Sequence, residues 1–414
     1  MNERLPAGLA DVERARSVLA GFTVATPLLH SAALSSLLGF PVYLKAENLQ
    51  RTGSFKVRGA FYKMSRLPAE ARARGVVSAS AGNHAQGVAL AASQLGIPAT
   101  IVMPAGAPIT KVQATAGYGA QVVLHGATVD DAYDRARELE RETGATFIPG
   151  FDDPDIVAGQ GTIGLEILDA LPDAGTVLVP VGGGGLISGI ALAIKSRRPA
   201  VRVVGVQAAG APAVHLSWQA GRYTTTDTVR TIADGIAVRR PGVLNWEYIR
   251  RYVDDVVTVG EEEIGHSILL LLERARLVVE GAGAVGLAAL LGRVRPEPGP
   301  VVVVLSGGNI DVNILSRIIE RGLVRAGRYV RLSALIPDRP GSLKRLLSTV
   351  AAQGANVLQV HHERWLDRVT VGEVEVDLAL ETRDHEHAAG LIAALERDGY
   401  SVRRVPPLRP TANW

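Results

Sequence analysis

The sequence predicts an α/β protein with open parallel sheets, followed by a small C-terminal βαββαβ domain of the ferredoxin-like type. Short strands alternate with helices from residue 41 to residue 207, a pattern typical of parallel sheets. The run 301–305 is entirely apolar, as expected for a strand in the middle of such a sheet. After residue 328 the order becomes strand, helix, strand, strand, helix, strand, which indicates a separate unit.

The individual elements follow from apolar periodicity and from breaker residues. An opening helix is expected at 8–21, where Asp11 is suited to cap it. Strands are expected at 41–45, 76–78, 99–103, 121–124, 176–181, 201–207 and 301–305, and helices after Lys56 and at 85–95, 111–118, 130–142, 162–171 and 186–198. In the C-terminal part we expect strands at 330–336, 355–364, 371–381 and 401–405, helices at 342–353 and 384–398, and a turn at 337–341.

Composition limits the class of protein. Hydrophobic residues make up 47% and charged residues 21% of 414 residues, which is ordinary for a soluble globular chain. The net charge of +3 is small and no basic block is present, so neither nucleic acid nor an anionic membrane is indicated as a partner. The chain has no cysteine, which excludes disulfides, thiolate metal sites and a cysteine nucleophile. No signal peptide is visible, and we expect a cytoplasmic protein.

Lys56 is the first candidate for chemistry. The chain has 38 arginines and only six lysines, so a lysine between Phe55 and Gly59 stands out. An amine loses its proton when desolvated and then attacks a carbonyl to form a Schiff base, which a guanidinium does not do. The alternative is a surface lysine at the start of a helix.

Two loops offer groups that bind anions. Ser80-Ala81-Gly82-Asn83-His84 lies between a predicted strand and helix, where backbone N–H groups and the helix dipole favour a small carboxylate. Gly182-Gly183-Gly184-Gly185 follows an apolar strand and opens a helix at Leu186, an arrangement suited to a phosphate monoester. The alternatives are an ordinary polar turn and a tight structural turn. His84 is favoured as a capping or packing residue over an acid–base role.

A fourth segment, Ser306-Gly307-Gly308-Asn309, follows the strand at 301–305. Ligands bind at the carboxyl ends of parallel strands, where Ser306 would present a neutral hydroxyl. A helix-capping serine is the alternative. Together the four segments describe one ligand with an aldehyde for Lys56, a phosphate for the glycine run and ring substituents for Asn83 and Ser306. Pyridoxal 5′-phosphate (PLP) has these groups.

The chain resembles the threonine dehydratases (threonine ammonia-lyases), PLP enzymes of the two-lobed tryptophan synthase β-like fold. The resemblance covers about residues 5–320, and beyond about 329 the chain resembles an ACT domain, a regulatory amino-acid-sensing module, by its turn at 337–341. The segments that carry it are Tyr43–Gln50, Ser54–Ala60, Ser80–Gln86, Gly159–Thr162, Val181–Gly185 and Ser306–Asn309. It implies a catalytic domain at 1–325 with a small lobe at about 46–150, a regulatory domain at 329–405 and a tail at 406–414.

The resemblance also implies roles. Lys56 would bind the PLP aldehyde and later act as base on the substrate Cα. Asn83 would bond the ring hydroxyl, and Ser306 the pyridine nitrogen. Gly182, Gly183, Gly184, Gly185 and Leu186 would hold the phosphate, and Ser80, Ala81, Gly82, Asn83 and His84 the substrate carboxylate. The implied reaction converts L-threonine to 2-oxobutanoate and ammonia, and L-serine to pyruvate, in isoleucine biosynthesis or threonine catabolism.

Two positions depart from related enzymes. Serine racemases of this fold carry a second base, a serine, at the position of Ala81, so racemisation is disfavoured. Some relatives bind a divalent cation through a glutamate at a position that is Gln207 here, so no metal is expected. Alternative functions are a lyase for serine or 3-hydroxyaspartate, and a catalytically silent amino-acid sensor. The C-terminal domain is expected to bind isoleucine or valine between two copies, or to serve only in homo-oligomerisation, or to be vestigial.

Overall fold

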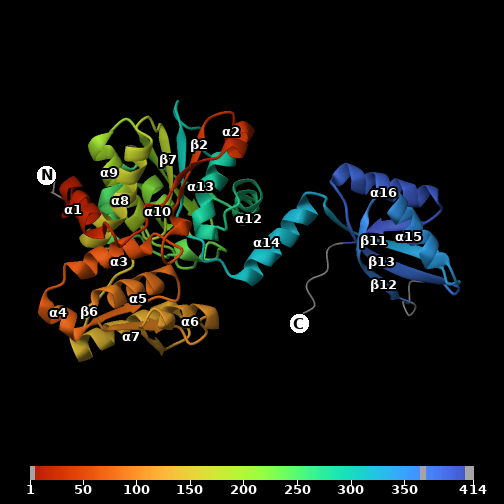
Figure 1. Ribbon diagram of the computed structural model, residues 1–414. Helices are drawn as coiled ribbons and strands as arrows, with labels where there is room; N and C mark the ends of the chain where they lie inside the picture. The colour runs from red at the N-terminus through yellow and green to blue at the C-terminus, as the bar shows by residue number, and fades with distance from the viewer. Residues whose placement is uncertain (1–4, 364–369, 406–414) are drawn as a thin grey trace. The chain divides into compact units, whose positions relative to one another are not determined.

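The structure is a computed structural model that describes residues 5–363 and 370–405. Its internal contacts divide the chain into two compact units, Met1–Ile310 and Asp311–Trp414 (Figure 1). The helix α14 (Val312–Arg325) groups with the second unit. The domain limits at 325 and 329 stay predictions. Each unit is described by itself.

The first unit is built around a six-stranded sheet. All neighbouring strands are parallel except β1, which pairs antiparallel with β2. The order is β1 (Leu28–His30), β2 (Val42–Ala46), β10 (Val301–Leu305), β7 (Thr176–Pro180), β8 (Arg202–Ala208) and β9 (Asp255–Val259). The apolar run at 301–305 is therefore an interior strand, as predicted.

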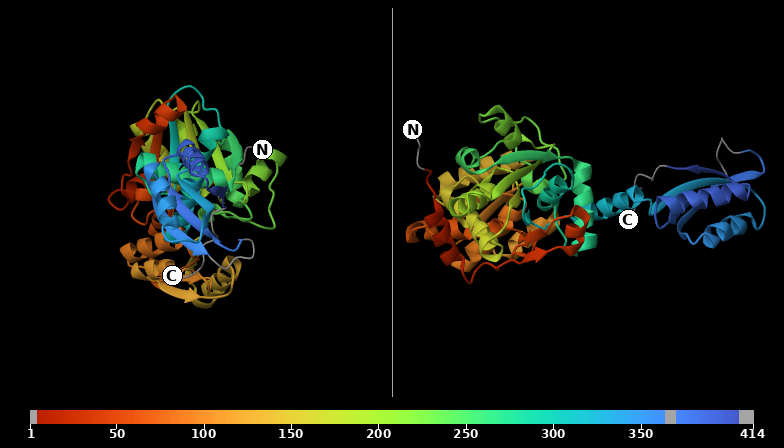
Figure 2. Two further views of the ribbon diagram at one scale, coloured as in Figure 1. Left: turned by 90° about the vertical axis from the view of Figure 1, so that its right-hand side faces the viewer. Right: turned by 90° about the horizontal axis from the view of Figure 1, so that it is seen from above.

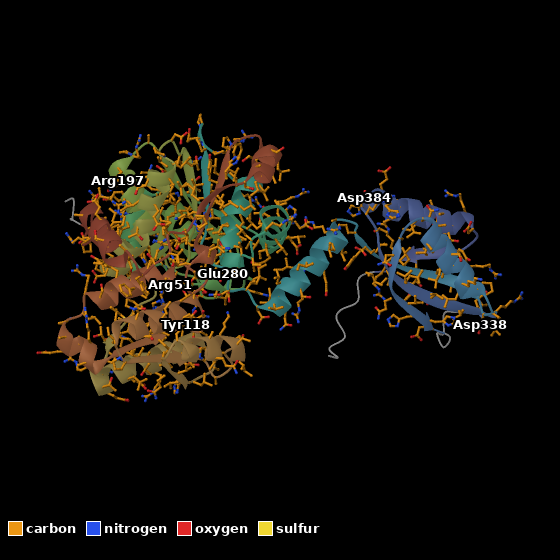
Figure 3. The ribbon with its side chains drawn as sticks, in the orientation of Figure 1. Arg51, Tyr118, Arg197, Glu280, Asp338 and Asp384 are labelled. Atoms are coloured by element: carbon orange, nitrogen blue, oxygen red, sulfur yellow. The ribbon has the colours of Figure 1, made fainter. Side chains whose placement is uncertain are left out.

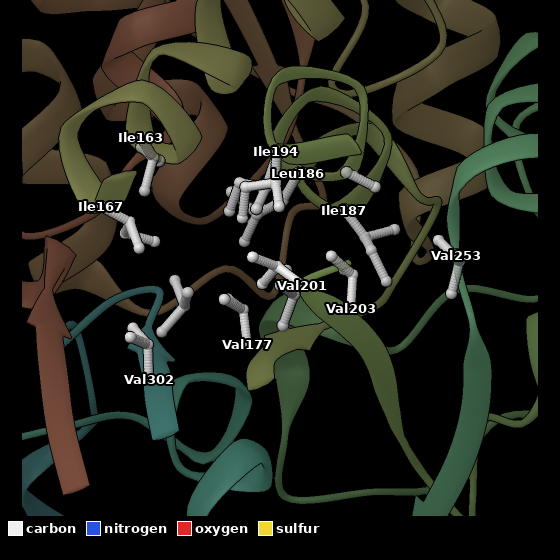
Figure 4. Packing of buried hydrophobic residues seen from close by; sticks show 14 of the residues in the cluster. Ile163, Ile167, Val177, Leu186, Ile187, Ile194, Val201, Val203, Val253 and Val302 are labelled. Atoms are coloured by element: carbon white, nitrogen blue, oxygen red, sulfur yellow. The ribbon is translucent and has the colours of Figure 1, made fainter. Parts of the chain in front are cut away.

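Helices cover this sheet and bury its side chains. Figure 4 shows part of the resulting core, in which Ile163 and Ile167 of α8 and Ile187 of α9 pack against Val177 and Val302 of the strands. The helices of this lobe are α1 (Leu9–Leu19), α2 (Ala32–Leu38), α8 (Pro154–Ala170), α9 (Gly185–Arg197), α10 (Ala213–Ala220), α11 (Val243–Tyr252), α12 (Glu261–Leu270) and α13 (Gly281–Gly292), with short turns η1 (Glu47–Leu49), η2 (Asp234–Ile236) and the π-helical η3 (Leu271–Ala275).

A second, four-stranded parallel sheet forms the smaller lobe of the same unit. Its strands lie between β2 and β7 in the chain, so this lobe is inserted into the larger one, and Figure 1 shows it beside the larger sheet. The order is β5 (Gln121–Leu124), β4 (Ala99–Met103), β3 (Val76–Ala79) and β6 (Thr146–Phe147). Its helices are α3 (Lys56–Ser65), α4 (Ala69–Arg74), α5 (Asn83–Leu95), α6 (Ile109–Gly117) and α7 (Val129–Thr143).

The second unit carries an antiparallel sheet with two helices on one face (Figure 2). The sheet order is β12 (Asn356–Glu363), β13 (Glu373–Glu381), β11 (Tyr329–Pro337) and β14 (Ser401–Arg404), and the helices are α15 (Ser342–Ala352) and α16 (His385–Arg397). Leu346 and Leu391 of the helices are fully buried against Leu332 and Val376 of the strands. The ferredoxin-like prediction is confirmed; residue 364 and the tail at 406–414 lie outside the described residues.

Several element limits differ from the predictions. The helix predicted at 162–171 begins at Pro154, because the carboxylate of Asp153 accepts the N–H groups of Asp155 and Ile156 and caps it there. The strand predicted from 371 begins at Glu373, after Gly372 adopts a φ of 94°. Within the described ranges, no helix has the length and apolar character needed to cross a membrane.

Candidate active site

Lys56 is the first residue of α3, at the junction of the two lobes of the first unit. Its Nζ donates a hydrogen bond of 2.8 Å to the carbonyl of Gly150 and lies 5.2 Å from the centre of the Phe55 ring. Burial lowers the pKa of Lys56 to about 8, against the opposing effect of the Glu280 carboxylate. A larger fraction of the amine is thus unprotonated near neutral pH than in an exposed lysine, which favours the predicted nucleophilic role.

The glycine run forms the turn between β7 and α9. Gly184 has a φ of 100°, a conformation that favours glycine, and precedes the first residue of α9. The first-turn N–H groups of a helix have no partner within the helix, so those of Gly185 and Leu186 are available to an anion. A Cβ added to Gly183 would lie 2.4 Å from the ring of Phe151, so the loop tolerates no side chain there.

The segment after β6 connects the lysine to the glycine run. Gly150 accepts the Lys56 hydrogen bond, and the next residue, Phe151, packs against the glycines. Asn245 holds both sides together, because its Nδ2 donates to the carbonyls of Phe151 at 3.1 Å and Gly183 at 3.0 Å. The amine and the anion-binding turn predicted from sequence therefore lie beside the same short segment. Gly150, Phe151 and Asn245 were not predicted.

The loop at 80–84 joins β3 to α5, and Asn83 is the first residue of that helix. Asn83 Nδ2 contacts both carboxylate oxygens of Glu280, at 2.8 and 3.0 Å, and its Oδ1 accepts 2.6 Å from Asn309 Nδ2. Within the loop, Gly82 N–H donates to Ser80 Oγ at 3.2 Å. Asn83 is thus oriented by two side chains from the larger lobe.

Glu280 is a site residue that the sequence predictions missed. It directly precedes α13, is 4% exposed, and in Figure 3 lies in the larger lobe on the side of the smaller one. Burial raises the pKa of Glu280 to about 7, although the hydrogen bond from Asn83 opposes this. A signal was present, because Glu280 is the single charged residue between Arg276 and Arg293. A lone carboxylate in an apolar run often marks a site.

His84 is buried behind the loop. Its Nε2 lies 3.0 Å from the carbonyl of Ile148, to which it donates. Burial and the neighbouring Lys56 lower the pKa of His84 to about 3, so the ring is neutral at physiological pH. This arrangement agrees with a packing role, while a contact to substrate stays a prediction.

Ser306 follows β10 directly and is 2% exposed. Its carbonyl accepts the N–H of Phe55 at 3.1 Å, and Ser54 forms a bridge with Gly307. The segment before Lys56 therefore pairs with the segment that carries Ser306. This pairing brings the predicted ring-nitrogen partner to the same region as the amine.

No group of three or more histidine or acidic residues suited to a metal ion occurs among residues 5–363 and 370–405. Gln207, at the position discussed above, is fully buried. Its Nε2 donates to the carbonyl of Val181 at 3.2 Å, and its Oε1 accepts the N–H of His215 at 2.8 Å. Both ends of this amide have structural partners. The expectation of no metal stays a prediction.

These residues fit a phosphorylated aldehyde. An amine of lowered pKa and a glycine turn at a helix N-terminus lie beside the segment Gly150–Phe151. A neutral serine at a strand end, Ser306, bonds through its carbonyl to Phe55, the neighbour of Lys56. Fold and site together define an enzyme that uses a lysine-bound carbonyl cofactor. The family model described as pyridoxal-phosphate dependent enzyme matches residues 20–307, and the chain belongs to this family, whose cofactor is pyridoxal 5′-phosphate.

Similar proteins are known in bacteria and plants. The chain is 51% identical over 397 residues to an L-threonine ammonia-lyase of Thermotoga maritima, covering 96% of this chain and 99% of the relative. It is 52% identical over 378 residues to an L-threonine ammonia-lyase of Geobacter sulfurreducens, covering 91% and 94%. The solved structure of processed threonine deaminase isoform 2 from Solanum lycopersicum is 38% identical, with a TM-score of 0.71 over 76% of this chain and 90% of the other.

Proposed function

We propose that the protein is a threonine ammonia-lyase, which converts L-threonine to 2-oxobutanoate and ammonia and also accepts L-serine to give pyruvate. One observation carries the proposal: an amine of lowered pKa, Lys56 Nζ, lies 2.8 Å from the carbonyl of Gly150 beside an anion-binding glycine turn. The similarity to two threonine ammonia-lyases over more than nine-tenths of the chain supports this substrate class.

Each residue of the site has a part in this reaction. When bound, PLP supplies the electron sink that accepts the electron pair of the substrate Cα–H bond. Lys56 removes the Cα proton once the substrate amine has displaced it, and its lowered pKa suits a base near neutral pH. The N–H groups at the start of α9 hold the cofactor phosphate, and those of the loop at 80–84 hold the substrate carboxylate.

The neutral partner at the ring nitrogen favours elimination. Ser306, buried at the end of β10, would offer the pyridine nitrogen a neutral hydroxyl in place of a carboxylate, which would favour rapid loss of the β-hydroxyl over a long-lived negative charge at Cα. Loss of water and then of ammonia, with one water taken up again, converts threonine to the keto acid in atom balance. At position 81 an alanine methyl offers no second proton donor, which disfavours racemisation.

A keto-acid assay over L-threonine, L-serine and 3-hydroxyaspartate tests the proposal. We expect the highest kcat/KM for threonine and a lower value for serine, since one methyl group in a pocket changes kcat/KM by ~10–200-fold. A preference for 3-hydroxyaspartate would replace the proposed substrate. D-serine formed from L-serine as fast as pyruvate would contradict the argument from Ala81.

A catalytically silent sensor is the second candidate. It would retain cofactor binding without turnover, and the same assay separates it from the enzyme. The intact arrangement of Lys56, Asn83 and the glycine turn favours the enzyme.

We further propose that the active form is a cytoplasmic dimer or tetramer. We also propose that the second unit is an ACT domain that binds an amino-acid effector such as isoleucine or valine. The four-stranded sheet of this unit has the topology of such domains. The unit contains a cavity of about 540 Å³ whose lining is both apolar and charged, including Leu358, Ala379, Glu320, Arg331 and Arg404. That lining suits a zwitterion with an apolar side chain. Light scattering tests the oligomeric state, and an effector screen tests the binding of isoleucine or valine.

A further inference from the structure

Two of the sequence segments that resemble the threonine dehydratases contain charged residues without an assigned role: Lys45 and Glu47 in Tyr43–Gln50, and Arg58 in Ser54–Ala60. Glu166 lies just beyond another of these segments, Gly159–Thr162. These four residues, here called the charge cluster, are joined by side-chain hydrogen bonds next to the first turn of α3. Arg58 is its centre and stands two residues after Lys56.

Two carboxylates grip Arg58 from different elements. Its Nε and Nη2 donate to the two oxygens of Glu47, each at 2.8 Å. Its Nη1 and Nη2 donate to the two oxygens of Glu166, at 2.5 and 3.0 Å. Both pairs are bidentate, the geometry that fixes a guanidinium most firmly. The first turn of α3 is thereby tied to η1 on one side and to α8 on the other.

Lys45 completes the cluster and balances its charge. Its Nζ donates to Glu166 Oε2 at 2.5 Å and to the carbonyl of Thr26 at 2.6 Å. Two carboxylates and two cations sum to zero, and the side chains of Glu47, Arg58 and Lys45 are only 0%, 1% and 3% exposed. Buried ion pairs are often no more stable than apolar packing, so stability alone does not explain the cluster.

The α3–α8 contact shows why exact placement matters. A Cβ added to Gly159 of α8 would lie 2.7 Å from Cα of Gly59 in α3, so the two helices touch through their backbones. Glu166 lies on the same helix as Gly159, and Arg58 directly precedes Gly59. The cluster therefore sets the angle and register of a close helix contact one turn from Lys56.

The charges that face Lys56 come from elsewhere. Burial lowers the pKa of Lys56, and the carboxylate of Glu280 at the start of α13 opposes this shift. His84 of α5 is also a titratable neighbour of Lys56, and its lowered pKa means that its ring is neutral at physiological pH. The charge cluster, although close in sequence, is not among the causes of the Lys56 shift. Because the four charges also sum to zero, we expect their combined effect on the amine to be small.

We propose that Lys45, Glu47, Arg58 and Glu166 are positioning residues for Lys56: they lock the first turn of α3 in place and, because their charges cancel, add no net charge near the amine beyond that of Glu280. The inference rests on the proposed role of Lys56 as the cofactor-binding lysine. The cluster has two properties that can be tested separately. The bidentate bonds of Arg58 fix the geometry of α3, and the zero charge sum keeps the cluster from shifting the pKa of Lys56.

The test uses the full chain stripped of cofactor, with PLP as the probe. The rate at which PLP bonds to the protein is followed by absorbance against pH, and borohydride with peptide mapping identifies the labelled lysine. The variants are Glu166→Gln, Lys45→Gln, the double variant and Arg58→Lys. The matched control is Lys195→Gln/Asp254→Asn, which neutralises an ion pair of 2.7 Å between α9 and the segment before β9, away from the cluster.

The two single variants should move the pH midpoint in opposite directions. Glu166→Gln leaves a net positive cluster and lowers the midpoint, whereas Lys45→Gln leaves a net negative one and raises it. A unit charge ~10 Å away at an effective dielectric constant of ~20 shifts a pKa by about one unit. The double variant restores the charge sum and should return the midpoint to that of the wild type, as should the control.

Arg58→Lys keeps the charge sum but loses the bidentate geometry. We expect an unchanged pH midpoint with a plateau rate at least ~10-fold lower, while circular dichroism shows a folded chain. Midpoints that stay unchanged in both single variants, or a double variant that is not restored, would overturn the electrostatic part. A wild-type plateau in Arg58→Lys would overturn the geometric part. Label on a lysine other than Lys56 in the wild type would instead reject the proposed function.

Discussion

At the scale of single residues, the site depends on how its titratable groups are placed relative to one another. The Lys56 amine is deprotonated more readily because it is buried, and the Glu280 carboxylate limits this effect. Glu280 itself has a raised pKa because it is buried, and it holds Asn83 through two contacts. The protonation of one group therefore depends on the other across the boundary between the lobes.

Replacing Glu280 by glutamine tests this dependence. The variant keeps an acceptor for Asn83 but removes the negative charge that raises the pKa of Lys56, so the amine should titrate below 8, by about one unit for a close pair. PLP bonding to the stripped chain rises with pH as the amine deprotonates, and its midpoint reports the value. A midpoint equal to or higher than that of the wild type would contradict the coupling. The control is Glu262→Gln, which removes the same charge from an exposed position.

The sequence allowed the amine and its immediate neighbours to be predicted, because residue type carries their chemistry. Lys56 stood out among six lysines, and Asn83 and Ser306 follow strands whose carboxyl ends meet. Glu280 is marked in the sequence only as a lone charge in an apolar run, and its contact with Asn83, which spans 197 residues, is encoded by no local pattern. Asn245 was missed for the same reason, since its two acceptors are main-chain carbonyls of distant loops.

At the scale of elements, the glycine turn before α9 is the most demanding structure in the site. Gly183 and Gly185 lie against Phe151, and Gly184 has a positive φ. The turn was predicted from four consecutive glycines after an apolar strand. The start of α8 was predicted too late, because the capping carboxylate of Asp153 lies before the apolar repeat that marked the helix.

Gly183→Ala should disturb this turn. Its methyl group would overlap the Phe151 ring, and forced overpacking costs about 1–3 kcal/mol. Because the turn is expected to hold the phosphate, the Kd for PLP should rise by ~10-fold or more, measured by absorbance titration. Gly292→Ala is the matched control, since a Cβ there meets nothing within 4 Å. Equal affinities in the two variants would show that the turn does not hold the phosphate.

At the scale of the whole molecule, the chain combines a two-lobed catalytic unit with a separately folded C-terminal unit. Alternating strands and helices predicted both sheet types, and the all-apolar strand predicted the centre of the larger one. The segment 209–300, with α10 to α13 and β9, was not resolved into elements from sequence. Its helices bury polar residues such as Asn245 and Ser267, which obscure the apolar repeat.

Removing residues 328–414, the part of the second unit that follows α14, tests its regulatory role. If it binds a branched-chain amino acid, isoleucine or valine should shift the threonine saturation curve of the full chain, and a chain ending at residue 327 should keep its activity but lose the shift. Steady-state kinetics with and without each of the twenty amino acids measure this. A full chain that responds to none of them would reject the sensor. A truncated chain that still responds would place the effector site in the first unit.

The central claim is that Lys56 holds PLP and acts on the substrate. Borohydride reduction of the intact protein, followed by peptide mass spectrometry and paired with 2-oxobutanoate production from threonine by Lys56→Ala, tests it most directly. We expect a pyridoxyl phosphate group on Lys56 and on none of the other five lysines, with turnover in the variant lower by at least ~10³-fold. Label on another lysine, or threonine turnover by the variant at the wild-type rate, would contradict it.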